Sequence, residues 1–267
     1  MITLIGHGYI GTEIESKMCI DSRFQYHWIH HNESIPKNTS VIINAAGYTG
    51  SPNVDACEIY RDETINGNVL WPLYLEKTNL NIPIIHISSG CVYTGYDKEY
   101  TELDPPNFTF SNGSFYSGSK ALAQSLLEPY MHKSYLLRIR MPFGSTQHQK
   151  NFLTKLHKYN KLIDFRNSLS CVDDVADVVI CMAINELYKT DKRAPGIYNV
   201  VNPGSKTTKE IANMMGITKD WFTYEEFSEA VTAPRSNCVL SSNKLDSIFK
   251  IPSIDVALKK AIENYTL

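Results

Sequence analysis

The sequence of 267 residues lacks the features that mark several classes of protein. No apolar run approaches the roughly 20 residues that cross a bilayer, and Met1 to Ile5 resemble a strand rather than a charged leader. Acidic and basic residues nearly balance, at 28 against 26, and no basic block occurs. We therefore expect a cytoplasmic protein with no membrane segment and no nucleic-acid surface.

The six cysteines also lack any grouping typical of a metal site. No CxxC pair and no Cys/His cluster at ligand spacing occurs among Cys19, Cys57, Cys91, Cys171, Cys181 and Cys238. We expect no bound metal, and we expect reduced, mostly buried thiols because no secretory leader is evident. Only Cys91 acquires a further interpretation, given below.

Short apolar segments alternate with longer amphipathic ones along the chain. The predicted strands are Ile2–Ile5, Phe24–Ile29, Val41–Asn44, Ile82–Ser88, Tyr135–Ile139 and Ile197–Val201, and the predicted helices are Tyr9–Met18, Glu63–Lys77, Ser117–Tyr130, Val172–Leu187 and, with a Thr cap, Thr207–Met215. Such alternation is typical of an α/β fold with a parallel sheet covered by helices. We expect a doubly wound sheet domain over residues 1–142, with part of 160–200 returning to the sheet and 143–267 mainly forming a smaller region.

The motif GHGYIG, Gly6 to Gly11, follows the first predicted strand and opens a helix. Gly6 permits a tight turn, Gly8 lets the backbone approach a diphosphate, and Gly11 allows close helix–strand packing. With Tyr9 and Ile10, these residues predict a dinucleotide site at a helix N-terminus in a Rossmann-type fold. Glycine-rich turns also occur for steric reasons alone, so the prediction depends on the strand–turn–helix context.

The end of the second predicted strand lacks an acidic residue. It reads His27-Trp28-Ile29-His30-His31-Asn32, whereas NAD-binding chains usually hold the ribose 2′-hydroxyl there with a carboxylate. The absence favours NADPH as cofactor, with NADH as the alternative. The histidines either contact a 2′-phosphate or form a polar strand end, and the sequence leaves both readings open.

The segment Tyr116-Ser117-Gly118-Ser119-Lys120 opens another predicted helix. Tyr116 and Lys120, four residues apart, share one helix face, and a nearby ammonium is expected to lower the pKa of the phenol. Such a phenol can donate a proton to a carbonyl oxygen. Ser89 ends a predicted strand at the edge of the sheet where ligands usually bind, and can hydrogen-bond the same carbonyl.

Together GHGYIG, Asn44-Ala45-Ala46-Gly47, the Ser89 region, YSGSK and Arg140-Met141-Pro142 resemble an extended short-chain dehydrogenase/reductase over nearly the whole chain. More narrowly, the chain resembles the UDP-4-keto-6-deoxyglucose 3,5-epimerase/4-reductase group, which makes UDP-L-rhamnose in plants and large DNA viruses. The stretches that carry this likeness are AAGYTGSPNVDACE (45–58), PNFTFSNGSFYSGSKA (106–121), RIRMPFG (138–144), KNFLTKL (150–156) and APRSN (233–237). It is similar, more distantly, to dTDP-4-dehydrorhamnose reductases and GDP-fucose synthases.

The resemblance implies roles for two residues that composition does not single out. A cysteine two residues after the catalytic hydroxyl and a second acid/base residue carry out epimerisation in the bifunctional members, and the matching positions are Cys91 and Lys155. A C4 ketone acidifies the hydrogens at C3 and C5, and inversion needs two proton-transfer groups flanking the ring. Tyr116 would stabilise each enolate and then protonate O4 as NADPH delivers hydride to C4. Without the resemblance, Lys155 is an ordinary solvated helix lysine.

The resemblance also implies contacts and partners. Asn44, Ala45, Ala46 and Gly47 join Tyr116 and Lys120 on the cofactor side, and Asn68 matches a helix-stabilising position. Plausible substrate contacts are Arg140, Asn151, Arg235 and Asn237, each of which could equally serve an internal ion pair or polar contact.

The expected substrate is UDP-4-keto-6-deoxyglucose, supplied by a separate 4,6-dehydratase, and a homodimer is expected. The sequence leaves open whether the sugar carries UDP, dTDP or GDP. A reductase without epimerase activity and a non-catalytic NADP-binding subunit remain the alternatives.

Overall fold

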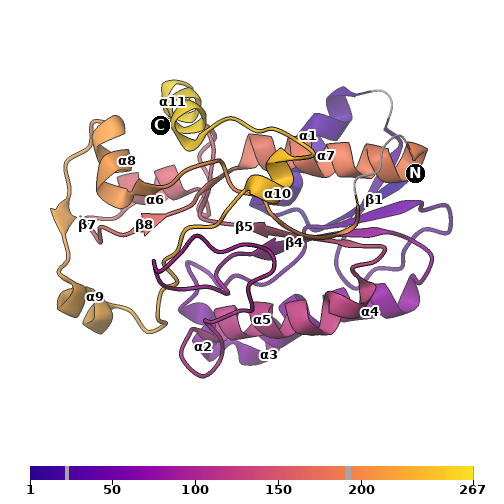
Figure 1. The fold of residues 1–267 in the computed structure, drawn as a ribbon, viewed down its shortest axis with the longest axis horizontal. Coiled ribbons are helices and arrows are strands. Elements are labelled where there is room, and N and C mark those ends of the chain that lie inside the picture. Colours follow the sequence, from indigo (N-terminus) through magenta and orange to yellow (C-terminus); the bar gives the residue numbers. More distant parts are fainter. Residues whose placement is uncertain (22–23, 190–193, 267) are drawn as a thin grey trace.

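A six-stranded parallel sheet forms the centre of the computed structural model, which describes residues 1–21, 24–189 and 194–266 (Figure 1). Across the sheet the strands are β10 (Gly196–Asn199), β5 (Tyr135–Ile139), β4 (Ile84–Ser89), β3 (Val41–Asn44), β1 (Ile2–Ile5) and β2 (Tyr26–Ile29). Every neighbouring pair is parallel. The predicted α/β class and all six predicted strands are confirmed; β1, β3 and β5 have the predicted bounds, and ends of β2, β4 and β10 are displaced by one or two residues.

Helices cover both faces of this sheet (Figure 1). One face carries α1 (Tyr9–Ile20) and α7 (Val172–Tyr188), and the other carries α3 (Arg61–Ile65), α4 (Trp71–Thr78) and α5 (Phe115–Leu127). Because helices cover both faces of the central strands, β1, β3 and β5 are buried along their whole length. This explains why their sequences read as continuous apolar runs rather than as alternating ones.

The direction of winding reverses between β1 and β3, which follow one another in the sheet although β2 lies between them in the chain. The carboxyl ends of β1 and β3 therefore flank the crevice where ligands bind in open parallel sheets. Within the described residues only β2 lies outside β1, whereas the common dinucleotide-binding order has a further outer strand.

The predicted helix Glu63–Lys77 is wrong as a single regular helix. Helix α3 ends at Ile65, a π-helical turn spans Asn66–Leu70, and α4 begins at Trp71. The wider turn presses Gly67 against a neighbouring loop, where an added Cβ would lie 3.2 Å from the Tyr48 nitrogen. Single π turns of this kind are frequent at functional sites.

The C-terminal part forms its own apolar cluster beside the sheet. Its helices are α6 (Phe152–Lys158), α8 (Thr208–Met214), α9 (Tyr224–Ala230), α10 (Asn243–Asp246) and α11 (Ile254–Glu263), and its short strand pairs are β6 (Pro142–Phe143) with β9 (Ser170–Cys171), β7 (Lys161–Leu162) with β12 (Asp220–Trp221), and β8 (Arg166–Asn167) with β11 (Lys206–Thr207). Phe143, Leu153 and Leu258 are among the buried members of this cluster.

The predicted Thr cap of α8 is confirmed. The Thr207 side chain accepts from the Glu210 N–H, and the Glu210 carboxylate accepts from the Thr207 N–H, which makes a capping box. The short helix α2 (Ala56–Ile59) lies beside α3 and α5. Within the described ranges, no helix combines the length and apolar character needed to cross a bilayer.

Candidate active site

The glycine turn between β1 and α1 has two packed positions and one open position. Gly6 has φ +91°, and an added Cβ would lie 2.6 Å from the Ala46 nitrogen; one on Gly11 would lie 2.0 Å from the Gly6 oxygen. A Cβ on Gly8 would meet nothing within 4 Å, and Gly8 caps α1 without a side-chain hydrogen bond. The N-terminus of α1 therefore faces open space at Gly8, as a bound diphosphate requires.

The loop after β3 forms the neighbouring wall of this crevice. Asn44 accepts a hydrogen bond from the Ala46 N–H at 3.3 Å and contacts the His86 ring nitrogen at 3.1 Å. A Cβ on Gly47 would lie 3.4 Å from the Lys120 Nζ, so the glycine lets the lysine approach the backbone closely. Asn44, Ala45, Ala46 and Gly47 thus lie beside the glycine turn and Lys120.

Asn68 ties this loop to helix α5 from the π turn. Its side-chain oxygen accepts from the Tyr48 N–H at 2.9 Å, and its amide donates to the Tyr48 carbonyl at 2.8 Å. The same amide donates to the Ser119 hydroxyl at 3.1 Å. Asn68 is 1% exposed, so these three bonds form a buried clamp next to Lys120.

Lys120 is a buried cation that has no partner within the described part of the chain. Its side chain is 7% exposed, its Nζ lies 5.9 Å from the Tyr116 ring centroid, and it has no hydrogen-bond or ion-pair partner among residues 1–21, 24–189 and 194–266. Burying an unpaired ammonium is costly unless a ligand completes its contacts. The open helix end at Gly8 and this lysine fit a dinucleotide, whose diphosphate and ribose hydroxyls supply acceptors.

Burial sets the proton affinities of Tyr116 and Lys120 in opposite directions. It lowers the pKa of Lys120 to about 8. Burial also raises the pKa of Tyr116, as does the charge of Cys91, while a hydrogen bond with Ser89 acts the other way. The expected lowering of the Tyr116 pKa by Lys120 is therefore wrong for the protein alone, because the loss of hydration dominates. Tyr116 keeps its proton, as a proton donor must.

Ser89, at the end of β4, brings Cys91 next to Tyr116. The Ser89 hydroxyl accepts a hydrogen bond from the Cys91 N–H at 3.1 Å. The sulfur of Cys91 accepts a hydrogen bond from the Arg140 guanidinium at 3.3 Å. The hydroxyl of Ser89, the phenol of Tyr116 and the thiol of Cys91 thus meet at the carboxyl edge of the sheet.

Lys155 reaches the same region from α6. Burial lowers its pKa to about 8, helped by the charges of Lys150 and Arg235 and opposed by that of Cys91. The charges of Lys155 and Cys91 are therefore close enough to interact. An amine with this pKa exists in both protonation states near neutral pH, which suits acid/base exchange.

The four predicted substrate contacts are all engaged within the protein. Asn151 caps α6 by accepting from the Leu153 N–H at 2.9 Å and donates to the Gly144 and Thr146 carbonyls. Asn237 accepts from Asn167 at 3.0 Å. These bonds account for the two asparagines by structural roles, and Arg140 is likewise turned inward.

Arg235 forms an internal ion pair, which was the alternative to its expected role as a substrate contact. Its two terminal nitrogens donate to both oxygens of Asp55, at 2.7 and 2.8 Å. Against the effect of burial, the hydrogen bond from Arg235 lowers the pKa of Asp55. The pair joins the 45–58 loop to the C-terminal region next to Lys155.

Two further contacts were not predicted from the sequence. The Tyr9 ring stacks on His148, with centroids 4.6 Å apart, and connects the glycine turn with the loop before α6. Lys150 donates to the Gly50 carbonyl. Lys150 lies within the stretch KNFLTKL, which could have drawn attention to it, whereas no local pattern marks His148 because its partner is 139 positions away by sequence number.

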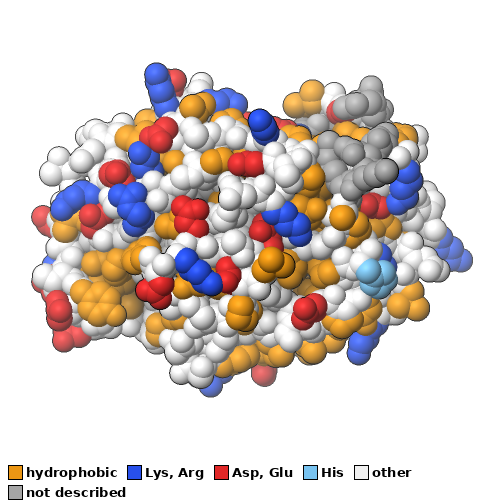
Figure 2. Space-filling view, viewed as in Figure 1, with side chains coloured by type: hydrophobic (Ala, Val, Ile, Leu, Met, Phe, Trp, Pro, Cys, Tyr) orange, Lys and Arg blue, Asp and Glu red, His pale blue; other side chains and the backbone are white. Residues whose placement is uncertain are grey.

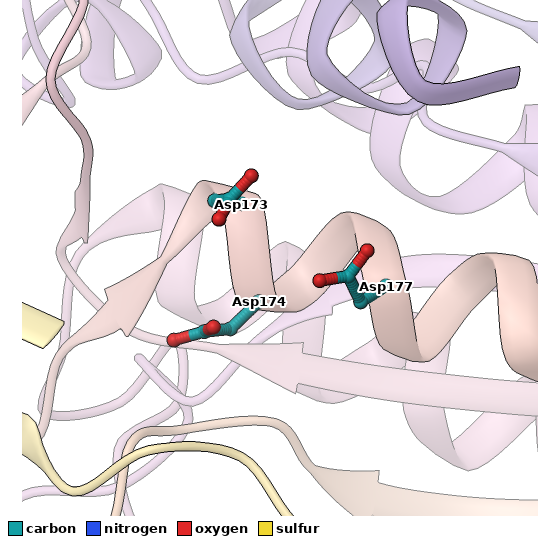
Figure 3. A group of neighbouring side chains, drawn as sticks. All are labelled: Asp173, Asp174 and Asp177. Carbon is teal, nitrogen blue, oxygen red and sulfur yellow. The ribbon is translucent and has the colours of Figure 1, made fainter. Parts of the chain in front are cut away.

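Three carboxylates at the start of α7 form the one acidic group in the described residues that could hold a metal: Asp173, Asp174 and Asp177 (Figure 3). Lys17 of α1 bonds Asp173 and Asp177, at 2.9 and 2.5 Å. Asn202 donates to Asp174 at 2.5 Å. These carboxylates therefore join α7 to α1 and to the loop after β10, and no metal site is inferred from them.

The fold and this site together define the class of the protein. The chain belongs to the extended short-chain dehydrogenase/reductase family, in the branch described as the RmlD substrate binding domain, which matches residues 30–267. The chain is 37% identical over 241 residues to the bifunctional dTDP-4-dehydrorhamnose 3,5-epimerase/dTDP-4-dehydrorhamnose reductase of Arabidopsis thaliana, covering 84% of this chain and 76% of that one. It is 35% identical to the trifunctional dehydratase/epimerase/reductase RHM1 of the same plant, of which it spans 34%.

Solved structures agree with the fold. The L780 UDP-rhamnose synthase of Acanthamoeba polyphaga mimivirus superposes with a TM-score of 0.87 at 26% identity, with 99% of each chain covered. A dTDP-4-dehydrorhamnose reductase from Bacillus anthracis in complex with NADP gives 0.79 at 18% identity, with 98% of each chain covered. The latter likeness concerns the fold alone.

Proposed function

We propose that this protein is a bifunctional enzyme that converts UDP-4-keto-6-deoxyglucose to UDP-L-rhamnose with NADPH, by 3,5-epimerisation followed by 4-reduction. The observation that carries the proposal is the convergence of Cys91 and Lys155 on the Tyr116–Ser89 pair. Reduction alone has no use for the first two residues. The activities for which the Arabidopsis and mimivirus relatives are named support the same assignment.

Reduction uses the polar groups at the carboxyl edge of the sheet. When bound, NADPH supplies the hydride for C4. Tyr116, kept protonated by burial, delivers its proton to O4, and Ser89 hydrogen-bonds the same oxygen before the transfer. Lys120 lies beside the phenol and stabilises the phenolate that remains.

Epimerisation uses the flanking pair. The Cys91 thiolate removes the proton from C3 or C5, the C–H electron pair moves into an enolate on O4, and Tyr116 hydrogen-bonds that oxygen. The Lys155 ammonium then returns a proton to the opposite face of the same carbon. The resulting thiol and amine recover their starting states by exchange with solvent, so that atoms and charge balance.

A reductase that accepts only an already inverted sugar is the second candidate. It is favoured by the match of residues 30–267 to the RmlD substrate binding domain. A reductase of this kind needs neither the buried Lys155 nor the contact between Cys91 and the Arg140 guanidinium. A non-catalytic subunit would in addition leave Tyr116, Lys120 and Ser89 assembled for no reaction.

The test is to incubate the purified protein with UDP-4-keto-6-deoxyglucose in deuterated water, with and without NADPH, and to follow the sugar by NMR. We expect deuterium at C3 and C5 without NADPH, and UDP-rhamnose with it. Cys91→Ser should abolish the exchange while hydride transfer to the already inverted keto sugar persists. Reduction without exchange in the unmodified protein would instead establish the reductase-only reading.

The same protein is proposed to act as a homodimer and to receive its substrate from a separate 4,6-dehydratase. Four apolar side chains are 38 to 55% exposed on α4, α5 and the π turn: Leu70, Tyr74, Leu122 and Leu126. Figure 2 shows hydrophobic side chains along the edge formed by these helices. Light scattering of Leu126→Glu should report a monomer, whereas Val256→Glu on α11 should not; a monomeric unmodified chain contradicts the proposal.

A further inference from the structure

Arg140 is a fully buried cation with no carboxylate beside it. Its side chain, at the end of β5, is 1% exposed. Among the residues that the structure describes, no Asp or Glu forms an ion pair with it. A buried guanidinium without an anion is strongly unfavourable, so another group near it is expected to carry negative charge.

The surrounding chain holds Arg140 in one position. The Ser170 hydroxyl accepts from the Arg140 N–H at 2.9 Å, and the Ser170 N–H donates to the Arg140 carbonyl at 2.7 Å. The aliphatic stem passes over Gly90, where an added Cβ would lie 2.8 Å from the Arg140 Cδ. Gly90 therefore lets the guanidinium reach Cys91, the next residue.

Hydrogen bonds to Ser236, Asn167 and Cys91 fix the guanidinium itself. One terminal nitrogen donates to the Ser236 hydroxyl at 2.7 Å and to the Cys91 sulfur at 3.3 Å. The other donates to the Ser236 carbonyl at 3.1 Å and to the Asn167 side-chain oxygen. Ser236 and Asn167 carry no charge, so these bonds orient the guanidinium without balancing it.

Three ionisable groups surround the guanidinium: Cys91, Cys238 and Tyr96. Burial raises the pKa of Cys238 and also that of Tyr96, which keeps both neutral near pH 7. Cys91 is the one of the three that directly accepts a hydrogen bond from Arg140. Of the three, the Cys91 sulfur is therefore the group placed to balance the buried charge.

We propose that Arg140 is a positioning residue for epimerisation: it aims the Cys91 sulfur and supplies the positive charge that stabilises its anionic form. The inference adds a residue to the proposed epimerase site, and the catalytic role of Arg140 rests on that proposed function. It reassigns Arg140 from the expected substrate contact to a partner of the base, and it leaves Lys155 free to act as the acid. A cation in direct contact is an established way to favour a thiolate.

The sharpest test adds a competing anion without removing the arginine. In Asn167→Asp, the isosteric carboxylate would pair with Arg140 and release Cys91. We expect iodoacetamide to alkylate Cys91 about tenfold more slowly than in the unmodified protein near neutral pH. Deuterium exchange at C3 and C5 should fall on the order of 100-fold, far more than hydride transfer to the already inverted sugar. Asn213→Asp, an exposed residue of α8, is the matched control and should alter none of these rates.

Two results overturn the inference: unchanged alkylation and exchange in Asn167→Asp, or an equal fall of exchange and reduction, which would indicate a structural role. Alkylation needs no substrate, so it separates this inference from the proposed function, which fails if the unmodified protein shows no exchange. If Asn167→Asp does not fold, the pH dependence of Cys91 alkylation in the unmodified protein still tests the inference. A Cys91 alkylation rate that rises with pH as steeply as in a short peptide of the same sequence refutes the proposal.

Discussion

Lys17 and Lys120 are both lysines with little exposed side chain, and their surroundings differ completely. Lys17, on α1, bonds Asp173 at 2.9 Å and Asp177 at 2.5 Å, and the hydrogen bonds that it donates to these carboxylates raise its pKa in spite of burial. Lys120, on α5, has no such partner within the described chain, and burial lowers its pKa to about 8. The first lysine joins two helices, and the second faces the crevice at the edge of the sheet.

The comparison separates charge that stabilises the fold from charge kept for a ligand. Around Lys17 every carboxylate of the α7 group has a partner within the protein. Around Lys120, Lys155 and Arg140, positive charges outnumber the nearby carboxylates, of which Asp55 is already paired with Arg235. Unpaired buried charge costs stability, so its presence indicates a binding or catalytic use.

Replacing each lysine with methionine should produce the largest difference between the two. Lys120→Met should reduce hydride transfer on the order of 1000-fold, because the phenolate of Tyr116 loses its cation. Lys17→Met should leave the rate within a few-fold and lower the unfolding temperature. Steady-state NADPH oxidation and thermal unfolding measure the two effects; comparable activity in both variants would contradict the assignment of Lys120.

The glycine turn contains the same contrast between packed and open positions. Gly11→Ala should cost about 3 kcal/mol or more of unfolding free energy, because its Cβ would lie 2.0 Å from the Gly6 oxygen. Gly8→Ala meets no atom within 4 Å and should fold normally, yet bind NADPH more weakly. Denaturant unfolding and equilibrium fluorescence titration separate the two. Equal destabilisation of both variants would refute the open position at Gly8.

The pH dependence of stability should differ between the two lysines. Below about pH 8 Lys120 is protonated in both states and its burial penalty is complete. Between that pKa and 10.5 only the unfolded state keeps the proton, so stability rises with pH, by about 3 kcal/mol at most. The raised pKa of Lys17 gives the opposite sign: its contribution is complete below the unfolded pKa and disappears as pH rises through the folded one.

Denaturant unfolding at several alkaline pH values measures this difference. The rise should be absent in Lys120→Met, relative to the unmodified protein under the same conditions. In Lys17→Met the loss of stability relative to the unmodified protein should shrink as pH increases. A rise of the same size in Lys120→Met would show that other groups cause it.

The smallest effect on stability is expected for Asp177, the more exposed of the two carboxylates that bond Lys17. Asp177→Asn should lower the free energy of unfolding by less than about 1 kcal/mol, because its side chain is 48% exposed and Lys17 keeps Asp173. High salt should reduce the difference further. Denaturant unfolding in low and high salt tests this, and a loss several times larger would mean that the cluster is tightly coupled.

Local patterns were enough to predict the strands, the glycine turn and the shared face of Tyr116 and Lys120, because each follows from residues close together in the chain. Apolar runs, the strand–turn–helix context and four-residue spacing are local patterns. The resemblance added Cys91 and Lys155. Neither the local patterns nor the resemblance indicated the π turn within residues 63–77. There, packing of Gly67 and Asn68 against Tyr48 overrides regular helix geometry.

How the polar residues of the site are used depends on contacts that form when the chain folds. Arg140 contacts Cys91, which is 49 positions away in the sequence, and Arg235 contacts Asp55, which is 180 positions away. The side chain of Asn151 is engaged in capping the N-terminus of α6. The proton affinity of Tyr116 likewise depends on burial rather than on its spacing from Lys120. Burial and pairing depend on which segments pack together, and a local pattern contains no information about its distant neighbours.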